Sequence, residues 1–267
     1  MMDAGRHPRI ALHTQSEVIG LDGRPGRFRA RVRTAPRYVD PELCVGCGLC
    51  AEACPATRPN PFDLGLKTAR AIDRPFPQAV PATYHLDREA CLNDSILRCQ
   101  RCVEACEPGA IDFDRDLEEY ELEVGAVVVA TGFDELDPRE LLPLGYGRAE
   151  NVLTGLEFER LLCATGPTRG HVVRPTDGRV PERIVFVQCV GSRGEGGRSW
   201  CSRYCCLNAV KAVQVAHDHE PGIQECVLLG TEMRATGRGH DAFVARVLGR
   251  DDVRVVKGRP AKIQEDP

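Results

Sequence analysis

Four cysteines near the start of the chain have a spacing that suits redox chemistry. They read C-x2-C-x2-C-x3-C-P, from Cys44 through Cys47 and Cys50 to Cys54, with Pro55 directly behind. Thiolates at this spacing bind cubane iron–sulfur clusters, three of them from one tight loop. The alternative is zinc, because C-x2-C also occurs in zinc knuckles. Structural zinc uses two well-separated pairs, so the sequence favours an iron–sulfur site.

A second set of cysteines repeats most of this spacing. Cys91, Cys99, Cys102 and Cys106 keep the x2 and x3 gaps, and Pro108 follows, but the first gap has seven residues in place of two. A longer loop can deliver one ligand without moving the others. In two-cluster ferredoxins the fourth cysteine of each run ligates the other cluster. This exchange predicts one cluster on Cys44, Cys47, Cys50 and Cys106, and another on Cys54, Cys91, Cys99 and Cys102.

A third group of cysteines lies in the second half of the chain. Cys189 ends a predicted strand, and Cys201, Cys205 and Cys206 open the helix that follows. In open α/β sheets, ligands bind beyond the carboxyl ends of the strands, where these four residues would meet. Two interpretations remain open from the spacing. The four could hold a further cluster, or they could be packing residues, since free cysteine is often fully buried.

Composition and charge are those of a cytoplasmic globular protein. The 267 residues leave room for about two domains. A net charge of −4 and dispersed basic residues argue against a nucleic-acid partner. No run approaches the roughly 18 apolar residues of a membrane span, and no signal peptide precedes the 14 cysteines. We therefore expect reduced cysteines committed to metal, with Cys163 and Cys226 left as core residues.

Hydrophobic periodicity predicts the elements that would position these cysteines. Strands are predicted at residues 10–14, 16–20, 27–33, 183–189, 226–229 and 253–256. Residues 124–130 form a short apolar run, typical of a buried parallel strand. Thr154 and Glu157 form a capping box for a helix that reaches Cys163. A second helix is predicted at residues 204–217, which gives a βαβ pattern, and the proline-rich residues 58–81 are predicted to be irregular.

Six strings of residues carry a resemblance to a known family. They are residues 38–47 (YVDPELCVGC), 75–81 (PFPQAVP), 129–133 (VATGF), 155–162 (GLEFERLL), 188–193 (QCVGSR) and 201–206 (CSRYCC). Together they resemble the A subunit of heterodisulfide reductase and its relatives outside methanogens, over nearly the whole chain. In that family a dicluster ferredoxin is inserted into a flavoprotein. The resemblance implies an α/β fold with an inserted α+β dicluster ferredoxin module on a partial thioredoxin-reductase-like flavoprotein scaffold.

The resemblance also implies roles for individual residues. The family's four cysteines in the last two strings hold an extra cluster near the flavin, which would fall on Cys189, Cys201, Cys205 and Cys206. The family's chain passes close to FAD where this sequence has Ala130, Thr131 and Gly132.

The chain departs from the family at both ends. Family members begin with a GxGxxG flavin-binding unit, and they end with a further flavin segment and more ferredoxin clusters, none of which this sequence contains. We expect it to correspond to the middle of a larger enzyme, as one piece of a split subunit or as a truncated reading frame. FAD is then expected only with a partner chain. Apolar surface at residues 127–130 and 10–12 would lie uncovered.

Four domains are expected. They are partial flavoprotein strands at residues 1–37, a two-[4Fe-4S] ferredoxin-type domain at 38–116, a returning flavin-domain strand and linker helix at 117–180, and a nucleotide-domain-like βαβ half with the third cysteine group at 181–267.

The expected function is electron transfer within a multi-subunit oxidoreductase. The chain would be a subunit or fragment that relays electrons between [4Fe-4S] clusters and a flavin or partner subunit. Its partners would be other redox subunits, either a flavin-binding chain or heterodisulfide reductase-like subunits. The alternative is a truncated remnant whose clusters only stabilise a structural or interaction protein.

Overall fold

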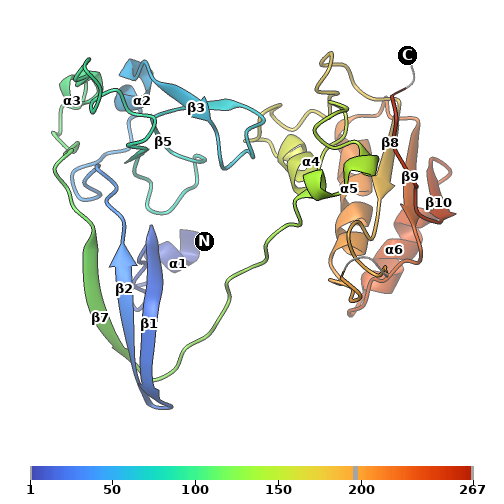
Figure 1. The fold of residues 1–267 in the computed structure, drawn as a ribbon, viewed down its shortest axis with the longest axis horizontal. Helices are drawn as coiled ribbons and strands as arrows, with labels where there is room; N and C mark the ends of the chain where they lie inside the picture. Colours follow the sequence, from blue (N-terminus) through green and yellow to red (C-terminus); the bar gives the residue numbers. More distant parts are fainter. Residues whose placement is uncertain (1, 195–197, 266–267) are drawn as a thin grey trace. The chain divides into compact units, whose positions relative to one another are not determined.

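The chain divides into two compact units, Met1–Gly132 and Phe133–Pro267 (Figure 1). The structure is a computed structural model that describes residues 2–194 and 198–265. A short helix, α1 (Met2–Arg6), opens the first unit. A three-stranded antiparallel sheet follows in the order β1–β2–β7. Its strands are β1 (Ser16–Arg24), β2 (Arg27–Thr34) and β7 (Glu118–Val124).

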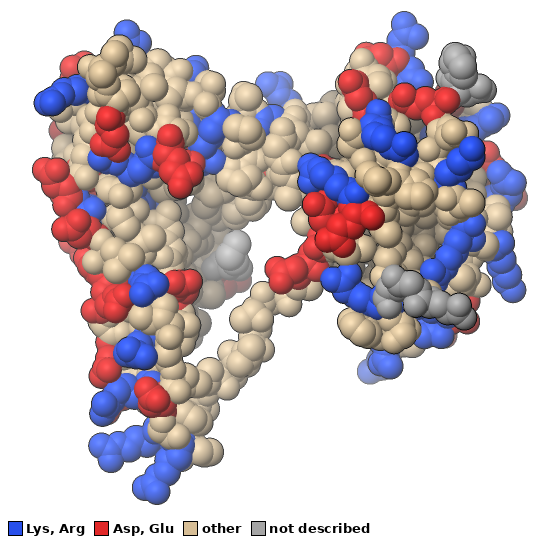
Figure 2. Space-filling view, viewed as in Figure 1, with Lys and Arg blue, Asp and Glu red and all other residues tan. Residues whose placement is uncertain are grey.

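Alternation of apolar and basic residues explains why β2 forms the middle strand. Ala30 and Val32 are buried. Arg29, Arg31 and Arg33 alternate with them and point the other way, as the period of two requires. Arg33 pairs with Glu119 on β7 at 2.8 Å. Figure 2 shows acidic and basic side chains interspersed along the visible face of this sheet.

A module rich in short elements occupies the chain between β2 and β7. Its elements are α2 (Leu49–Ala53), β3 (Thr57–Pro59), β4 (Thr68–Arg70), β5 (Ile72–Asp73), β6 (His85–Leu86) and α3 (Arg101–Glu104). Strand β3 pairs with β4, and β5 pairs with β6. The two ends of the module meet, because the Asp40 N–H donates to the Ala110 carbonyl at 2.7 Å and the Asp112 N–H donates to the Tyr38 carbonyl at 3.0 Å.

Cysteines form part of the core of this module. Apolar side chains such as Val39, Ile72 and Leu86 are buried in one cluster with Cys50 and Cys102. Elements of two to five residues do not hold themselves together in water. The core around the thiols is therefore what keeps this module folded.

Three predictions for the first unit are wrong in whole or in part. Residues 10–14 and 125–130 form no strand, and residues 58–81 are less irregular than predicted, because β4 and β5 lie within them. Val128 is 90% exposed. A buried parallel strand needs neighbouring strands, and none of the described strands pairs with residues 125–130. The expectation that apolar residues 127–130 and 10–12 include uncovered surface is confirmed, since Ile10, Leu12 and residues 127–129 are exposed.

The second unit is built on a three-stranded parallel sheet in the order β10–β9–β8. Two one-turn 3-10 helices, η1 (Pro138–Glu140) and η2 (Leu142–Leu144), precede it. Its strands and helices are α4 (Gly155–Leu162), β8 (Arg183–Val187), α5 (Cys205–His219), β9 (Glu225–Gly230), α6 (His240–Leu248) and β10 (Val253–Lys257). Val210 and Val213 of α5 are fully buried against Leu228 of β9 and Val247 of α6.

The sequence predictions for this unit largely agree with the structure. The βαβ pattern is confirmed as β8, α5 and β9. The capping box is confirmed, with the Thr154 N–H donating to Glu157 at 2.6 Å and the Glu157 N–H donating to the Thr154 hydroxyl at 3.1 Å. Helix α6 carries no such start signal, since Gly239 precedes it without a side-chain cap. Among the described helices, none is long and apolar enough to cross a membrane.

Candidate metal centres

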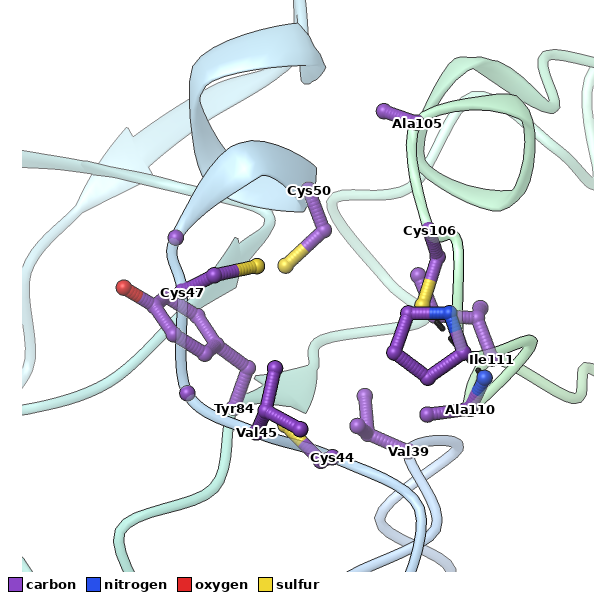
Figure 3. Close-up of a pocket in the computed structure, with 13 residues that line it drawn as sticks. Val39, Cys44, Val45, Cys47, Cys50, Tyr84, Ala105, Cys106, Ala110 and Ile111 are labelled. Carbon is purple, nitrogen blue, oxygen red and sulfur yellow. Dashed lines mark hydrogen bonds between the residues drawn. The ribbon is translucent and has the colours of Figure 1, made fainter.

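Four of the predicted ligands surround one cavity in the module (Figure 3). They are Cys44, Cys47, Cys50 and Cys106, which we call the first site. Cys44 and Cys47 lie on the loop before α2, Cys50 lies within α2, and Cys106 follows α3. In Figure 3 the sulfur atoms of Cys47 and Cys50 point toward each other, and Cys106 reaches in from the opposite wall. The structure thus joins three thiols of the first run with the last thiol of the second.

Two glycines give the loop of the first site its path. Gly46 and Gly48 have φ angles of 71° and 95°, which favour residues without a Cβ. A Cβ on Gly46 would lie 2.9 Å from the Ala82 carbonyl oxygen, and a Cβ on Gly48 would lie 3.0 Å from the hydroxyl of Tyr84. The loop can therefore wrap its thiols around the cavity only because these positions are glycine.

The surroundings of the first site are mostly apolar. Val39, Val45 and Ile111 line the cavity beside the thiols. Burial raises the pKa of Cys50 to about 12. The backbone N–H of Ala110 donates to the Cys106 sulfur at 3.3 Å. A buried thiol with a raised pKa keeps its proton when no metal is bound. It loses that proton when it becomes a metal ligand.

We call the remaining cysteines of the two runs, Cys54, Cys91, Cys99 and Cys102, the second site, as the exchange predicts. Burial raises the pKa of Cys102 to about 11, and Cys91 and Cys54 lie near enough to raise it further. Cys54 thus lies near Cys91 and Cys102 of the second run. Cys102 also lies near Cys50 of the first site. The side-chain amide of Asn93 donates to the Cys99 carbonyl at 3.1 Å. This hydrogen bond closes the long loop between Cys91 and Cys99.

Three of the four cysteines of the third site come together in the second unit. Cys189 is buried just after the end of β8, and Cys205 and Cys206 begin α5. A hydrogen bond from the thiol of Cys206 lowers the pKa of Cys205, and the Cys189 N–H contributes in the same direction. The same hydrogen bond raises the pKa of Cys206. Cys205 is thus the member of this pair that more readily carries negative charge.

Cys201, the fourth predicted ligand, does not open the helix as predicted, because α5 begins at Cys205. The sulfur of Cys201 accepts the backbone N–H of Arg203 at 3.3 Å. The structure therefore assembles Cys189, Cys205 and Cys206, and it places Cys201 on the loop that leads to them.

The residues predicted to contact flavin do not lie in a strand. Ala130, Thr131 and Gly132 are exposed and lie in irregular chain after β7. None of the described strands pairs with them. The structure thus shows no sheet around these residues within the described part of the chain.

Some neighbours of the sites could not be identified from spacing. Tyr84 lines the first cavity, but nothing in its sequence context marks it. Arg193 and Thr231 contact Cys189, with the Arg193 guanidinium 3.9 Å from the sulfur. Arg193 belongs to the string QCVGSR, so its proximity to the third site had a signal in the sequence. Thr231 had none.

The thiols of the first site surround a cavity and do not converge on a point. In residues 2–194 and 198–265, no three histidine, cysteine, aspartate or glutamate side chains lie close enough to hold one metal ion. A cubane is ligated at its corners, so four thiols around a cavity fit a [4Fe-4S] cluster. The donor set is also the one that such clusters use.

Comparison with known proteins agrees with this chemistry. Residues 37–56 match the model of a 4Fe-4S binding domain. This match covers the first cysteine run and supports iron–sulfur over zinc. It also establishes the ferredoxin-type domain that was predicted from the spacing.

Relatives extend the similarity to the whole chain. The chain is 44% identical to the A subunit of the H(2):CoB-CoM heterodisulfide,ferredoxin reductase of Methanothermobacter thermautotrophicus. It is 46% identical to the first of two iron–sulfur A subunits of the CoB–CoM heterodisulfide reductase of Methanopyrus kandleri. Both alignments cover 100% of the chain and 40% of the relative. A third relative, the A subunit of the ferredoxin:CoB-CoM heterodisulfide reductase of Methanosarcina mazei, is 37% identical over 98% of the chain and 32% of its own length. The predicted resemblance is therefore confirmed, and the chain is homologous over its full length to a portion of the A subunit of heterodisulfide reductase.

Proposed function

We propose that this chain is an electron-transfer iron–sulfur component of a multi-subunit oxidoreductase that resembles heterodisulfide reductase. The observation that carries the proposal is the cavity lined by Cys44, Cys47, Cys50 and Cys106. The first three of these cysteines lie within the residues that match a 4Fe-4S binding domain. Support also comes from the names of the relatives, which describe iron–sulfur and reductase subunits.

We assign one [4Fe-4S] cluster to the first site and another to the second. A third cluster is proposed at Cys189, Cys201, Cys205 and Cys206. Once bound, such clusters accept and release single electrons. The protein's contribution is to ligate them, to bury them and to donate N–H groups to their sulfur ligands, which sets their potentials. The N–H of Ala110 on Cys106 is one such donor in the first site.

The first test is the metal content and its redox behaviour. Protein purified anaerobically should contain about eight irons per chain for the first two sites, or about twelve if the third is filled. Dithionite should reduce the clusters reversibly, with electron paramagnetic resonance signals of reduced cubanes. Stoichiometric zinc without acid-labile sulfide would contradict the proposal. Bound iron that cannot be reversibly reduced would favour the alternative of a cluster-stabilised structural protein.

We further propose that the chain works with a partner that completes a flavin site. The scaffold would be of the thioredoxin-reductase type, with Ala130, Thr131 and Gly132 beside the FAD. One observation supports a partner. Residues 127–129 and Phe133 expose apolar side chains next to these positions. Fourteen unpaired thiols suit a reducing compartment, so we place the complex in the cytoplasm.

Flavin content should depend on the partner. A dinucleotide needs the N-terminus of a helix after a glycine turn to hold its pyrophosphate, and this sequence lacks the GxGxxG unit. The chain alone is therefore expected to retain little FAD. Co-purification with a chain that carries GxGxxG should yield stoichiometric flavin. Tightly held, stoichiometric FAD on the isolated chain would overturn this part of the proposal.

A further inference from the structure

A guanidinium group lies against one sulfur of the third site. Nη1 of Arg193 is 3.9 Å from the Sγ of Cys189 and 2.8 Å from the Oγ1 of Thr231. Nη2 of the same arginine donates to Glu232 at 2.7 Å. The hydroxyl of Thr231 is itself 3.7 Å from the Cys189 sulfur. One side chain thus connects the thiol to two residues that follow β9.

The backbone holds Arg193 in this position. Cys189 and Arg193 both have left-handed φ angles, of 60° and 59°, which non-glycine residues adopt rarely. The N–H of Ser192 donates to the Cys189 carbonyl at 3.2 Å. Arg259 donates to the carbonyls of Ser192 and Arg193, each at 2.8 Å. Several hydrogen bonds therefore fix the turn between Cys189 and Arg193, and this turn holds the guanidinium beside the thiol.

Neutralising Glu232 does not require Arg193. Arg234 also pairs with the Glu232 carboxylate. The Arg193 side chain is only 19% exposed, whereas that of Arg234 is 44% exposed. The more buried arginine is the one directed at the thiol. This arrangement suits a donor to sulfur better than a surface ion pair.

We propose that Arg193 is a positioning residue that sets the reduction potential of the third centre through Cys189. The inference rests on the proposed cluster at the third site. A hydrogen bond from a cation to a thiolate ligand stabilises the state with more negative charge. Reduction adds one electron to the centre and no proton, so the guanidinium favours the reduced form. Arg193 therefore makes this centre a better electron acceptor than it would be without the guanidinium.

The test is the midpoint potential of the third centre in Arg193→Met. It is measured in an anaerobic redox titration that is monitored by electron paramagnetic resonance. At a fixed solution potential, the ratio of reduced to oxidised centre should fall about tenfold, which is about 59 mV for one electron. Arg193→Lys keeps the charge but loses the planar fork, so it should lie between the wild type and Arg193→Met. Arg183→Met is the matched control. It removes the same charge from the opposite end of β8, where Arg183 is 73% exposed and pairs with Glu225, and it should leave the potential unchanged.

Iron content separates this inference from the proposed cluster. If Cys205→Ser retains all the iron and every signal, the third centre itself does not exist. If Cys205→Ser loses that centre while Arg193→Met keeps both its iron and the wild-type potential, Arg193 does not tune the centre. Should Arg193→Met lose the iron of this centre, the potential of Arg193→Lys decides. A lowered potential supports the inference, and a wild-type value overturns it.

Discussion

Replacing Cys47 with serine is expected to remove about four irons per chain, those of the first site, and to weaken the second site. The thiol of Cys47 is exposed, so serine leaves no defect in the core. Cys102→Ser should act in the same way from the second site. The two losses are linked because the proposed exchange places Cys54 and Cys106 each at the site opposite their own run. Iron analysis and the spectra of the reduced clusters measure both effects.

A third variant and a control complete this series. Cys205→Ser should remove only the iron of the third site, because that residue lies in the second unit. Cys163→Ser should retain all the iron, since Cys163 caps the end of α4 and belongs to none of the three sets. Full iron content in Cys47→Ser would contradict the ligand assignment of the first site.

Removing the metal should unfold the module at residues 38–116 while the core of the second unit stays folded. The module has helices of four and five residues and strands of two and three. Structures this short depend on their core, and that core contains Cys50, Cys54 and Cys102. Metal bound only by the folded state contributes its binding free energy directly to folding. The second unit has a 15-residue helix and an apolar core of its own.

Amide hydrogen exchange after anaerobic chelation measures this difference directly. Protection around Ile72 and Leu86 should fall nearly to that of a frayed segment, while protection around Val213 and Leu228 should persist. Module amides that stay protected in iron-free protein would show that the fold does not depend on metal. Equal loss in both units would show that unfolding is global.

Local patterns were predicted well from the sequence. The cysteine spacings and the capping box at Thr154 involve residues within one turn or loop, and such patterns survive without knowledge of the fold. The βαβ unit was also predictable, because the periods of its strands and helix differ clearly. For the first site, the exchange rule grouped the same four cysteines that line one cavity in the structure.

Features that depend on distant neighbours were predicted poorly. The apolar run at 124–130 has the composition of a buried strand, yet Val128 is 90% exposed, because burial depends on what pairs with it. The start of the second helix was also misjudged. The sequence predicts that Cys201 opens this helix with Cys205 and Cys206, but α5 begins only at Cys205. Contacts such as Thr231 with Cys189 join residues far apart in sequence, and no local pattern encodes them.

The pairing of β2 with β7 has an architectural consequence. Thr34 and Glu118 are partners in this ladder, so the whole metal-binding module is inserted at the turn of a β-hairpin. Its own ends are joined by the hydrogen bonds of Asp40 and Asp112. A segment whose ends meet can be gained, lost or exchanged between proteins without disturbing the host sheet. The module is therefore an insertion that is structurally separable from its host sheet. A short turn in its place would leave the three strands of that sheet in register.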